Sequence, residues 1–87
     1  MKKILFYTPD CIPCHNDEYH YYDTVNLIKA HNFVLDERLV KAVPEWQQEA
    51  DAFNAPLPIL YEPESNQYLS IYPFNKAVVE AFLNAVK

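Results

Sequence analysis

Hydrophobic and polar positions in the first half of the chain predict a strand, a helix and a second strand. Residues 3–8 (KILFYT) form a nearly continuous apolar run, as expected of a strand buried on both faces. From about Cys14 to His31 the spacing becomes helical. Three apolar residues then recur at i, i+4 and i+7: Tyr21, Val25 and Ile28. Residues 33–40 (FVLDERLV) begin apolar and β-branched, so they predict a second strand that fades into a loop.

The second half predicts a helix, two strands and a last helix. Pro44 suits the first turn of a helix that Asn54 ends, with three residues on one face: Trp46, Ala50 and Phe53. Of these, we expect Trp46 in the core. Residues 57–62 and 67–72 predict strands, and the turn-forming residues 63–66 between them predict an antiparallel hairpin. From residue 73 or 75 to 86, one helical face gathers the apolar positions: Val78, Val79, Phe82, Leu83 and Val86.

The predicted order is therefore β-α-β-α-β-β-α. Two strands joined by a helical crossover pair in parallel, and the hairpin adds an antiparallel half. We expect an α/β fold with a four-stranded mixed sheet covered by three helices, in a single domain over residues 1–87. A monomer is the default expectation for a domain of this size.

Composition and charge narrow the classes of function. Apolar residues make up 51% of the 87, enough for a core, and the net charge of −5 argues against a nucleic-acid partner, which needs a basic surface. No apolar run is long enough to span a bilayer, and the run after Lys3 is too short for a signal peptide. We therefore expect a cytoplasmic protein without a membrane partner.

The chain contains no glycine. This excludes the glycine-rich loops that cradle nucleotide phosphates. Left-handed backbone positions must then fall to asparagine, the next most tolerant residue. Three asparagines lie where such positions are expected: Asn32, Asn54 and Asn66.

The only two cysteines lie in the stretch TPDCIPCH, as Cys11 and Cys14. In a reducing compartment such a pair is more often catalytic or metal-binding than structural, and a disulfide between the two would close almost no loop. With His15 the stretch also fits the attachment motif of c-type haem. Haem attachment is disfavoured, because the only methionine is Met1 and no export signal is present.

With these elements in place, the chain resembles the minimal thioredoxin fold, and in length and element order it is most similar to glutaredoxins. The resemblance runs from Lys3 to Val86. It rests on the Cys-x-x-Cys directly after the first strand, on the element order and on Pro58 in PLPILY. It implies a cis Leu57–Pro58 bond facing the dithiol, with the Leu57 backbone offered to an incoming chain.

The resemblance also implies the chemistry of a thiol–disulfide oxidoreductase. Cys11, expected just ahead of the first helix, would attack a substrate disulfide as a thiolate, its pKa modestly lowered by the helix N-terminus. Cys14 would then resolve the mixed disulfide. Ile12 and Pro13 set the turn between the two thiols, and Tyr7 is expected to line the substrate groove.

The electron donor stays open between glutathione and thioredoxin reductase. Glutaredoxins usually follow the fourth strand with Gly-Gly and an Asp that hold glutathione, whereas here Tyr72-Pro73 stands there. Asn75 and Lys76 at the start of the last helix could still receive a carboxylate. Thioredoxins carry a buried Asp six residues before the first cysteine, and here that position is Leu5. Some glutaredoxin-sized proteins reduced by thioredoxin reductase serve ribonucleotide reductase, which is one candidate partner beside other disulfide proteins.

Two other classes of function compete with the enzyme. One is a metal or iron–sulfur carrier that uses Cys11 and Cys14 with an outside ligand, although two thiolates are too few for a closed zinc site. The other is a binding module without catalysis that has kept the fold. We expect no bound cofactor and no resident metal, with glutathione as a candidate co-substrate.

Overall fold

The computed structural model describes residues 2–9 and 20–87 of the chain. Its elements follow the predicted order β-α-β-α-β-β-α. They are β1 (Lys3–Thr8), α2 (Tyr21–Ala30), β2 (Val34–Leu39), α3 (Pro44–Ala52), β3 (Ile59–Glu62), β4 (Gln67–Ser70) and α4 (Lys76–Ala85). The α/β prediction, with a four-stranded mixed sheet and three described helices, is confirmed.

The sheet has the strand order β2-β1-β3-β4. β1 pairs in parallel with β2, with Tyr7 opposite Arg38, because the chain between them crosses over through a helix. β1 pairs antiparallel with β3, with Tyr7 opposite Ile59, and the β3–β4 hairpin completes the antiparallel half. The two central strands, β1 and β3, are the most deeply buried, as the apolar run at residues 3–8 predicted.

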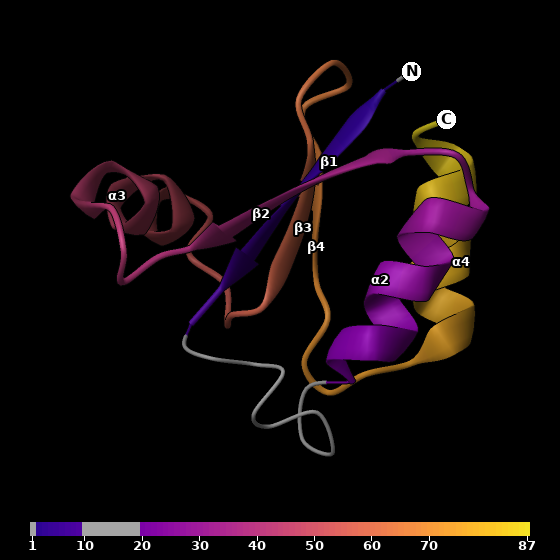
Figure 1. Ribbon diagram of the computed structural model, residues 1–87, viewed down its shortest axis with the longest axis horizontal. Helices are drawn as coiled ribbons and strands as arrows, with labels where there is room; N and C mark the ends of the chain where they lie inside the picture. The colour runs from indigo at the N-terminus through magenta and orange to yellow at the C-terminus, as the bar shows by residue number, and fades with distance from the viewer. Residues whose placement is uncertain (1, 10–19) are drawn as a thin grey trace.

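Helices cover both faces of the sheet. Figure 1 shows α2 and α4 side by side on one face and α3 alone on the other. Along β1 the side chains alternate, so Ile4 and Phe6 join the core under α2 and α4, while Leu5 and Tyr7 join the core under α3. Within residues 2–9 and 20–87, no helix is long and apolar enough to cross a membrane.

The first predicted helix is shorter than its apolar spacing indicated. We expected one helix from about Cys14 to His31, but α2 begins at Tyr21, and residues 10–19 lie outside the described part of the chain. His20 has a left-handed backbone conformation (φ 53°, ψ 48°), which no α-helix passes through. The His20 carbonyl accepts hydrogen bonds from the N–H and the hydroxyl of Thr24, so His20 is the N-cap of α2.

The three asparagines predicted at left-handed positions are confirmed. Asn32, Asn54 and Asn66 have φ values of 64°, 53° and 56°. Asn54 and Asn66 stand in the two connections that flank β3, and Asn32 follows the end of α2. A chain without glycine therefore makes these turns with the residue type that tolerates them next best.

Two further expectations needed correction. Val78 was placed on the buried face of the last helix but is 47% exposed, whereas Val79, Leu83 and Val86 are buried as predicted. The hairpin strands are also shorter than the predicted ranges 57–62 and 67–72. β3 begins only after Pro58, because proline has no N–H to donate to a neighbouring strand.

The β3–β4 turn is held by a buried carboxylate. The Glu62 side chain has no exposed surface and accepts hydrogen bonds from the N–H groups of Glu64 at 2.7 Å and Ser65 at 2.8 Å. Lys2 Nζ lies 4.0 Å from the same carboxylate and donates to the Val86 carbonyl at 3.0 Å. Burial opposes the charge on Glu62, but these hydrogen bonds and Lys2 outweigh it and lower its pKa.

We expect Glu62→Gln to lower the free energy of unfolding by about 2 kcal/mol at pH 7, because hydrogen bonds to a buried charge are replaced by weaker ones. A carboxyl whose pKa is lowered on folding stabilises the fold above its unfolded pKa, near 4.5, and this contribution is lost as the pH falls. Urea unfolding at pH 6 and pH 3 should therefore show the difference between wild type and variant shrinking at pH 3. Glu64→Gln, in the exposed turn, is the matched control and should change little.

Candidate functional site

Three segments of the chain converge at one edge of the sheet. Because β1 and β2 are parallel, both end at this edge, and the antiparallel β3 begins there. Thr8 ends β1, Leu39 ends β2, and Pro58 stands immediately before the first residue of β3. Figure 1 shows the starts of α2 and α4 at the same end of the molecule. Sites in open α/β sheets lie at such carboxyl ends of strands.

The predicted dithiol belongs to the connection that leaves this edge. Cys11, Ile12, Pro13 and Cys14 lie outside the described residues, so their predicted roles stay predictions. In the sequence, Cys11 follows Pro9, the last described residue before this connection, by two positions.

The Leu57–Pro58 peptide bond is cis, as predicted. Pro58 is buried and Leu57 is half-buried. Two hydrogen bonds fix the backbone on either side of Leu57, one from Ser70 Oγ to the Pro56 carbonyl at 2.6 Å and one from the Ile71 N–H to the Pro58 carbonyl at 3.0 Å. Leu57 is thus held at the sheet edge between two anchored neighbours.

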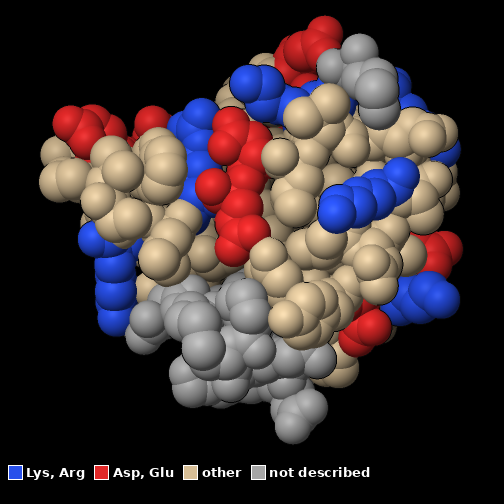
Figure 2. All heavy atoms as spheres, viewed as in Figure 1, with Lys and Arg blue, Asp and Glu red and all other residues tan. Residues whose placement is uncertain are grey.

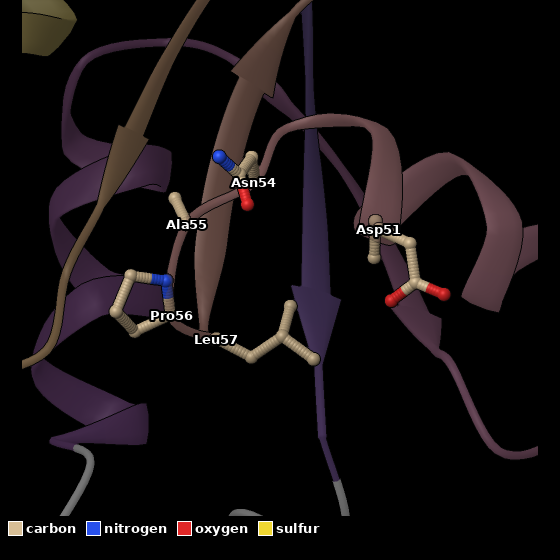
Figure 3. A pocket seen from close by; sticks show the side chains of 6 residues that line it. Asp51, Asn54, Ala55, Pro56 and Leu57 are labelled. Carbon is tan, nitrogen blue, oxygen red and sulfur yellow. The ribbon is translucent and has the colours of Figure 1, made fainter.

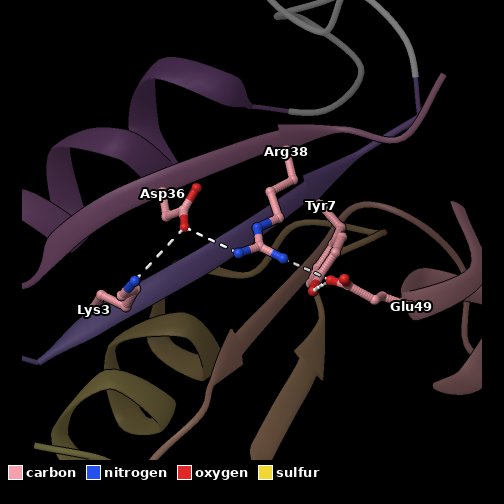
Figure 4. A network of polar contacts seen from close by, with 5 residues as sticks. All are labelled: Lys3, Tyr7, Asp36, Arg38 and Glu49. Atoms are coloured by element: carbon pink, nitrogen blue, oxygen red, sulfur yellow. Dashed lines mark hydrogen bonds and ion pairs between the residues drawn. The ribbon is translucent and has the colours of Figure 1, made fainter. Parts of the chain in front are cut away.

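Tyr7 lies at this edge in a polar network that joins β1, β2 and α3 (Figure 4). The buried Tyr7, only 2% exposed, donates its hydroxyl proton to Glu49 Oε1 at 2.5 Å. Arg38 Nη1 donates to the same oxygen at 2.6 Å, and Arg38 Nη2 lies 3.3 Å from Asp36 Oδ2. Lys3 lies 4.0 Å from Asp36 and extends the network along β1. Figure 2 shows acidic side chains gathered in the region of β2, with basic ones beside them.

Arg38 lies between two aromatic rings. Its guanidinium carbon lies 5.8 Å from the ring centre of Tyr7 and 5.7 Å from that of Trp46. Such cation–π contacts add to the ion pair with Glu49. We expected Trp46 in the core, and this was wrong, because its ring is half-buried and packs beneath Arg38 at the surface.

The network changes the acidity of its members. Burial, the hydrogen bond to Glu49 and the negative charge of that residue raise the pKa of Tyr7 well above its usual value. For Arg38, burial opposes the charge, but the hydrogen bond and charge of Asp36, with Tyr7 and Glu49, outweigh it and raise its pKa. Tyr7 and Arg38 therefore stay protonated, and Glu49 receives hydrogen bonds from both.

Two buried polar atoms near the edge have no hydrogen-bond partner within the described part of the chain. They are Thr8 Oγ1, on a residue 1% exposed, and Arg38 Nε. The buried Thr8 hydroxyl belongs to the last residue of β1, next to the connection that carries Cys11. Unpartnered buried polar groups are unusual in folded proteins.

The helix N-terminus that was expected to lower the pKa of Cys11 is not that of α2. This helix begins at Tyr21, well after the cysteines, and the left-handed His20 separates it from them. The dipole of α2 therefore cannot be assigned to the thiol as the sequence suggested.

Asn75 and Lys76 lie at the start of α4, as predicted. The Asn75 side chain is the N-cap and accepts a hydrogen bond from the Val78 N–H at 3.2 Å. This N–H at the start of the helix is therefore not available to a ligand. Lys76 Nζ is exposed and lies 3.8 Å from Glu80. Lys76 also lines a pocket of about 460 Å³ beside His20, whose ring stacks on Phe74 at 4.6 Å.

Comparison of the chain with protein-family models, with curated proteins and with solved structures found no match. Fold class therefore rests on the topology itself. The order β-α-β-α-β-β-α with a mixed sheet of order β2-β1-β3-β4 is consistent with a thioredoxin-like fold.

Arg38, Glu49 and the capping role of His20 were not predicted from the sequence. One signal for Glu49 was present, because a carboxylate three residues after Trp46 lies near the helical face assigned to the core. No pattern pointed to Arg38, which meets Glu49 only through the pairing of β2 with β1 and the packing of α3.

We expect Tyr7→Phe to lower the free energy of unfolding by about 2 kcal/mol at pH 8, because it removes the hydrogen bond from the buried Tyr7 hydroxyl to the Glu49 carboxylate, which keeps the hydrogen bond from Arg38. A tyrosine with a raised pKa in the fold stabilises it below its unfolded pKa of 10, and this stabilisation is lost as the pH rises further. Between pH 10 and 11, urea unfolding of the wild type should show a fall steeper than that of the variant by up to about 1.4 kcal/mol per pH unit. Tyr68→Phe, at an exposed position, should keep the wild-type slope; equal slopes for Tyr7→Phe would contradict the assignment.

Proposed function

We propose that the protein is a thiol–disulfide oxidoreductase that reduces disulfides through a Cys11–Cys14 dithiol. The observation that carries the proposal is the position of the Leu57–Pro58 segment. Pro58 precedes Ile59, which pairs with Tyr7, and the Cys-x-x-Cys follows Tyr7 within a few residues. The anchored backbone around Leu57 thus lies at the edge of the sheet where β1 ends, just before the Cys-x-x-Cys in the sequence, and this supports the proposal.

In the proposed cycle, the Cys11 thiolate attacks one sulfur of a substrate disulfide. A mixed disulfide forms, and the other substrate sulfur leaves as a thiolate. Cys14 then loses its proton and attacks Cys11 Sγ, so the second substrate sulfur leaves and takes up a proton. The substrate gains two electrons and two protons, and the Cys11–Cys14 disulfide is reduced again by an external thiol donor.

Ile12, Pro13 and Leu57 are the residues that we propose contact the substrate beside the cysteines, and Tyr7, expected to line the groove but only 2% exposed, supports them from within the core. Pro58 fixes the direction in which the Leu57 backbone is presented. Because Glu49 accepts the hydrogen bond of the Tyr7 hydroxyl and Arg38 lies over the Tyr7 ring, this ring has a fixed position at the site.

Protein disulfides are the proposed substrates, with ribonucleotide reductase as one candidate partner, in a reducing cytoplasmic compartment. Glutathione and thioredoxin reductase are the two candidate donors. Asn75 already caps α4, so Lys76 is the residue left at this helix start to receive a glutathione carboxylate. The protein would act as a monomer.

An equilibrium titration of the protein in glutathione redox buffers tests the proposal, with acid quenching, alkylation and mass spectrometry. The wild type should pass reversibly from a doubly alkylated dithiol to an unalkylated disulfide. Cys14→Ser should accumulate a mixed disulfide on Cys11, because the resolving thiol is gone, while Cys11→Ser should form no adduct at the attacking position and lose disulfide reductase activity by at least about a hundredfold.

The species observed separate the alternatives. A glutathione adduct on Cys11 in the wild type supports glutathione as co-substrate, and a more reducing transition without it supports a donor of the thioredoxin reductase class. Visible absorbance of the purified protein with bound iron would favour the metal carrier. Absence of any reversible transition would reject the oxidoreductase and favour the binding module.

A further inference from the structure

A pocket of about 410 Å³ opens directly beside Leu57 (Figure 3). It lies between the end of α3 and the segment that leads to β3. Its lining residues are Ala50, Asp51, Asn54, Ala55, Pro56 and Leu57. The volume is at the small end of the range of ligand pockets, about 300–1,000 Å³.

The pocket combines aliphatic walls with one negative charge. Ala55 and Leu57 supply apolar surface, and among the described residues of the lining Asp51 is the only charged one. Gln47 Nε2 donates to Asp51 Oδ1 at 2.8 Å from one turn earlier in α3, which steadies the carboxylate. Figure 3 shows Asp51 on α3 across from the segment that carries Leu57.

Leu57 connects this pocket with the proposed reaction. A substrate chain that runs along the Leu57 backbone brings the side chains next to its disulfide to the mouth of the pocket. Lysine and arginine side chains combine an apolar stem with a cationic end, which matches aliphatic walls closed by a carboxylate.

We propose that this pocket selects disulfide substrates with a lysine or arginine next to the reacting cysteine. The stem of the basic side chain packs against Ala55 and Leu57, and its charge pairs with Asp51. Glutathione, with two carboxylates and one ammonium group, brings a net negative charge to the same place and fits it less well. This inference rests on the proposed oxidoreductase function.

The test uses single-turnover reduction of short peptides by the pre-reduced full-length protein. Each peptide carries one cysteine in a mixed disulfide with thionitrobenzoate, whose release is followed by absorbance. The peptides differ only in lysine, norleucine or glutamate beside the cysteine, placed before or after it. A free small dithiol gives the intrinsic reactivity of each peptide, to which the rates are normalised.

The wild type should reduce the lysine peptide roughly twofold to fivefold faster than the norleucine peptide, because exposed ion pairs have this strength, and the glutamate peptide should be slowest. Asp51→Asn should abolish the preference, and Asp51→Lys should invert it in favour of glutamate. Glu64→Gln makes the same change in net charge far from Leu57 and should keep the wild-type preference.

The two proposals fail in different ways. If the wild type reduces all peptides at equal normalised rates, or if Asp51→Asn keeps the lysine preference with an unchanged circular dichroism spectrum, the pocket assignment is wrong while the oxidoreductase stands. If no peptide reacts faster than with the free dithiol, the proposed function itself is rejected.

Discussion

The pairing of β1 on both of its edges is the constraint on which the rest of the structure depends. Its central residues, Ile4 to Tyr7, are all buried, and they supply side chains alternately to the core under α2 and α4 and to the core under α3. A strand in this position cannot shift by one residue without exchanging both sets of side chains. Register in β1 therefore fixes both which side chain faces α3 and where the chain leaves the sheet toward the cysteines.

On the side of the sheet that faces α3, Leu5 lies in the apolar core, and a carboxylate enters from α3, as Glu49 bonded to Tyr7 and Arg38. This carboxylate is held by two donors at the edge of the sheet. The electrostatics of this edge are thus built from a tyrosine, an arginine and a glutamate that come from three elements.

The order of strands and helices could be predicted from the sequence, because apolar spacing and turn-forming residues are patterns of neighbouring positions. Asn32, Asn54 and Asn66 were identified at left-handed positions from the absence of glycine, whereas the cis Leu57–Pro58 bond was expected from the resemblance to glutaredoxins. The break at His20 could not be predicted, because the apolar spacing of about 3.6 residues per turn does not reveal a single left-handed residue. Arg38 and Asp51 gained their candidate roles only through tertiary packing, which brings together segments that share no pattern.

The absence of glycine also shapes the unfolded ensemble. Every residue of an unfolded chain without glycine carries a Cβ atom, so the backbone has less conformational freedom to lose when it folds. The cost appears in the folded state, where His20 and the three asparagines hold φ values between 53° and 64° that a glycine would adopt freely. The same lack of glycine therefore lowers the entropy that the backbone loses on folding and adds local backbone strain to the folded state.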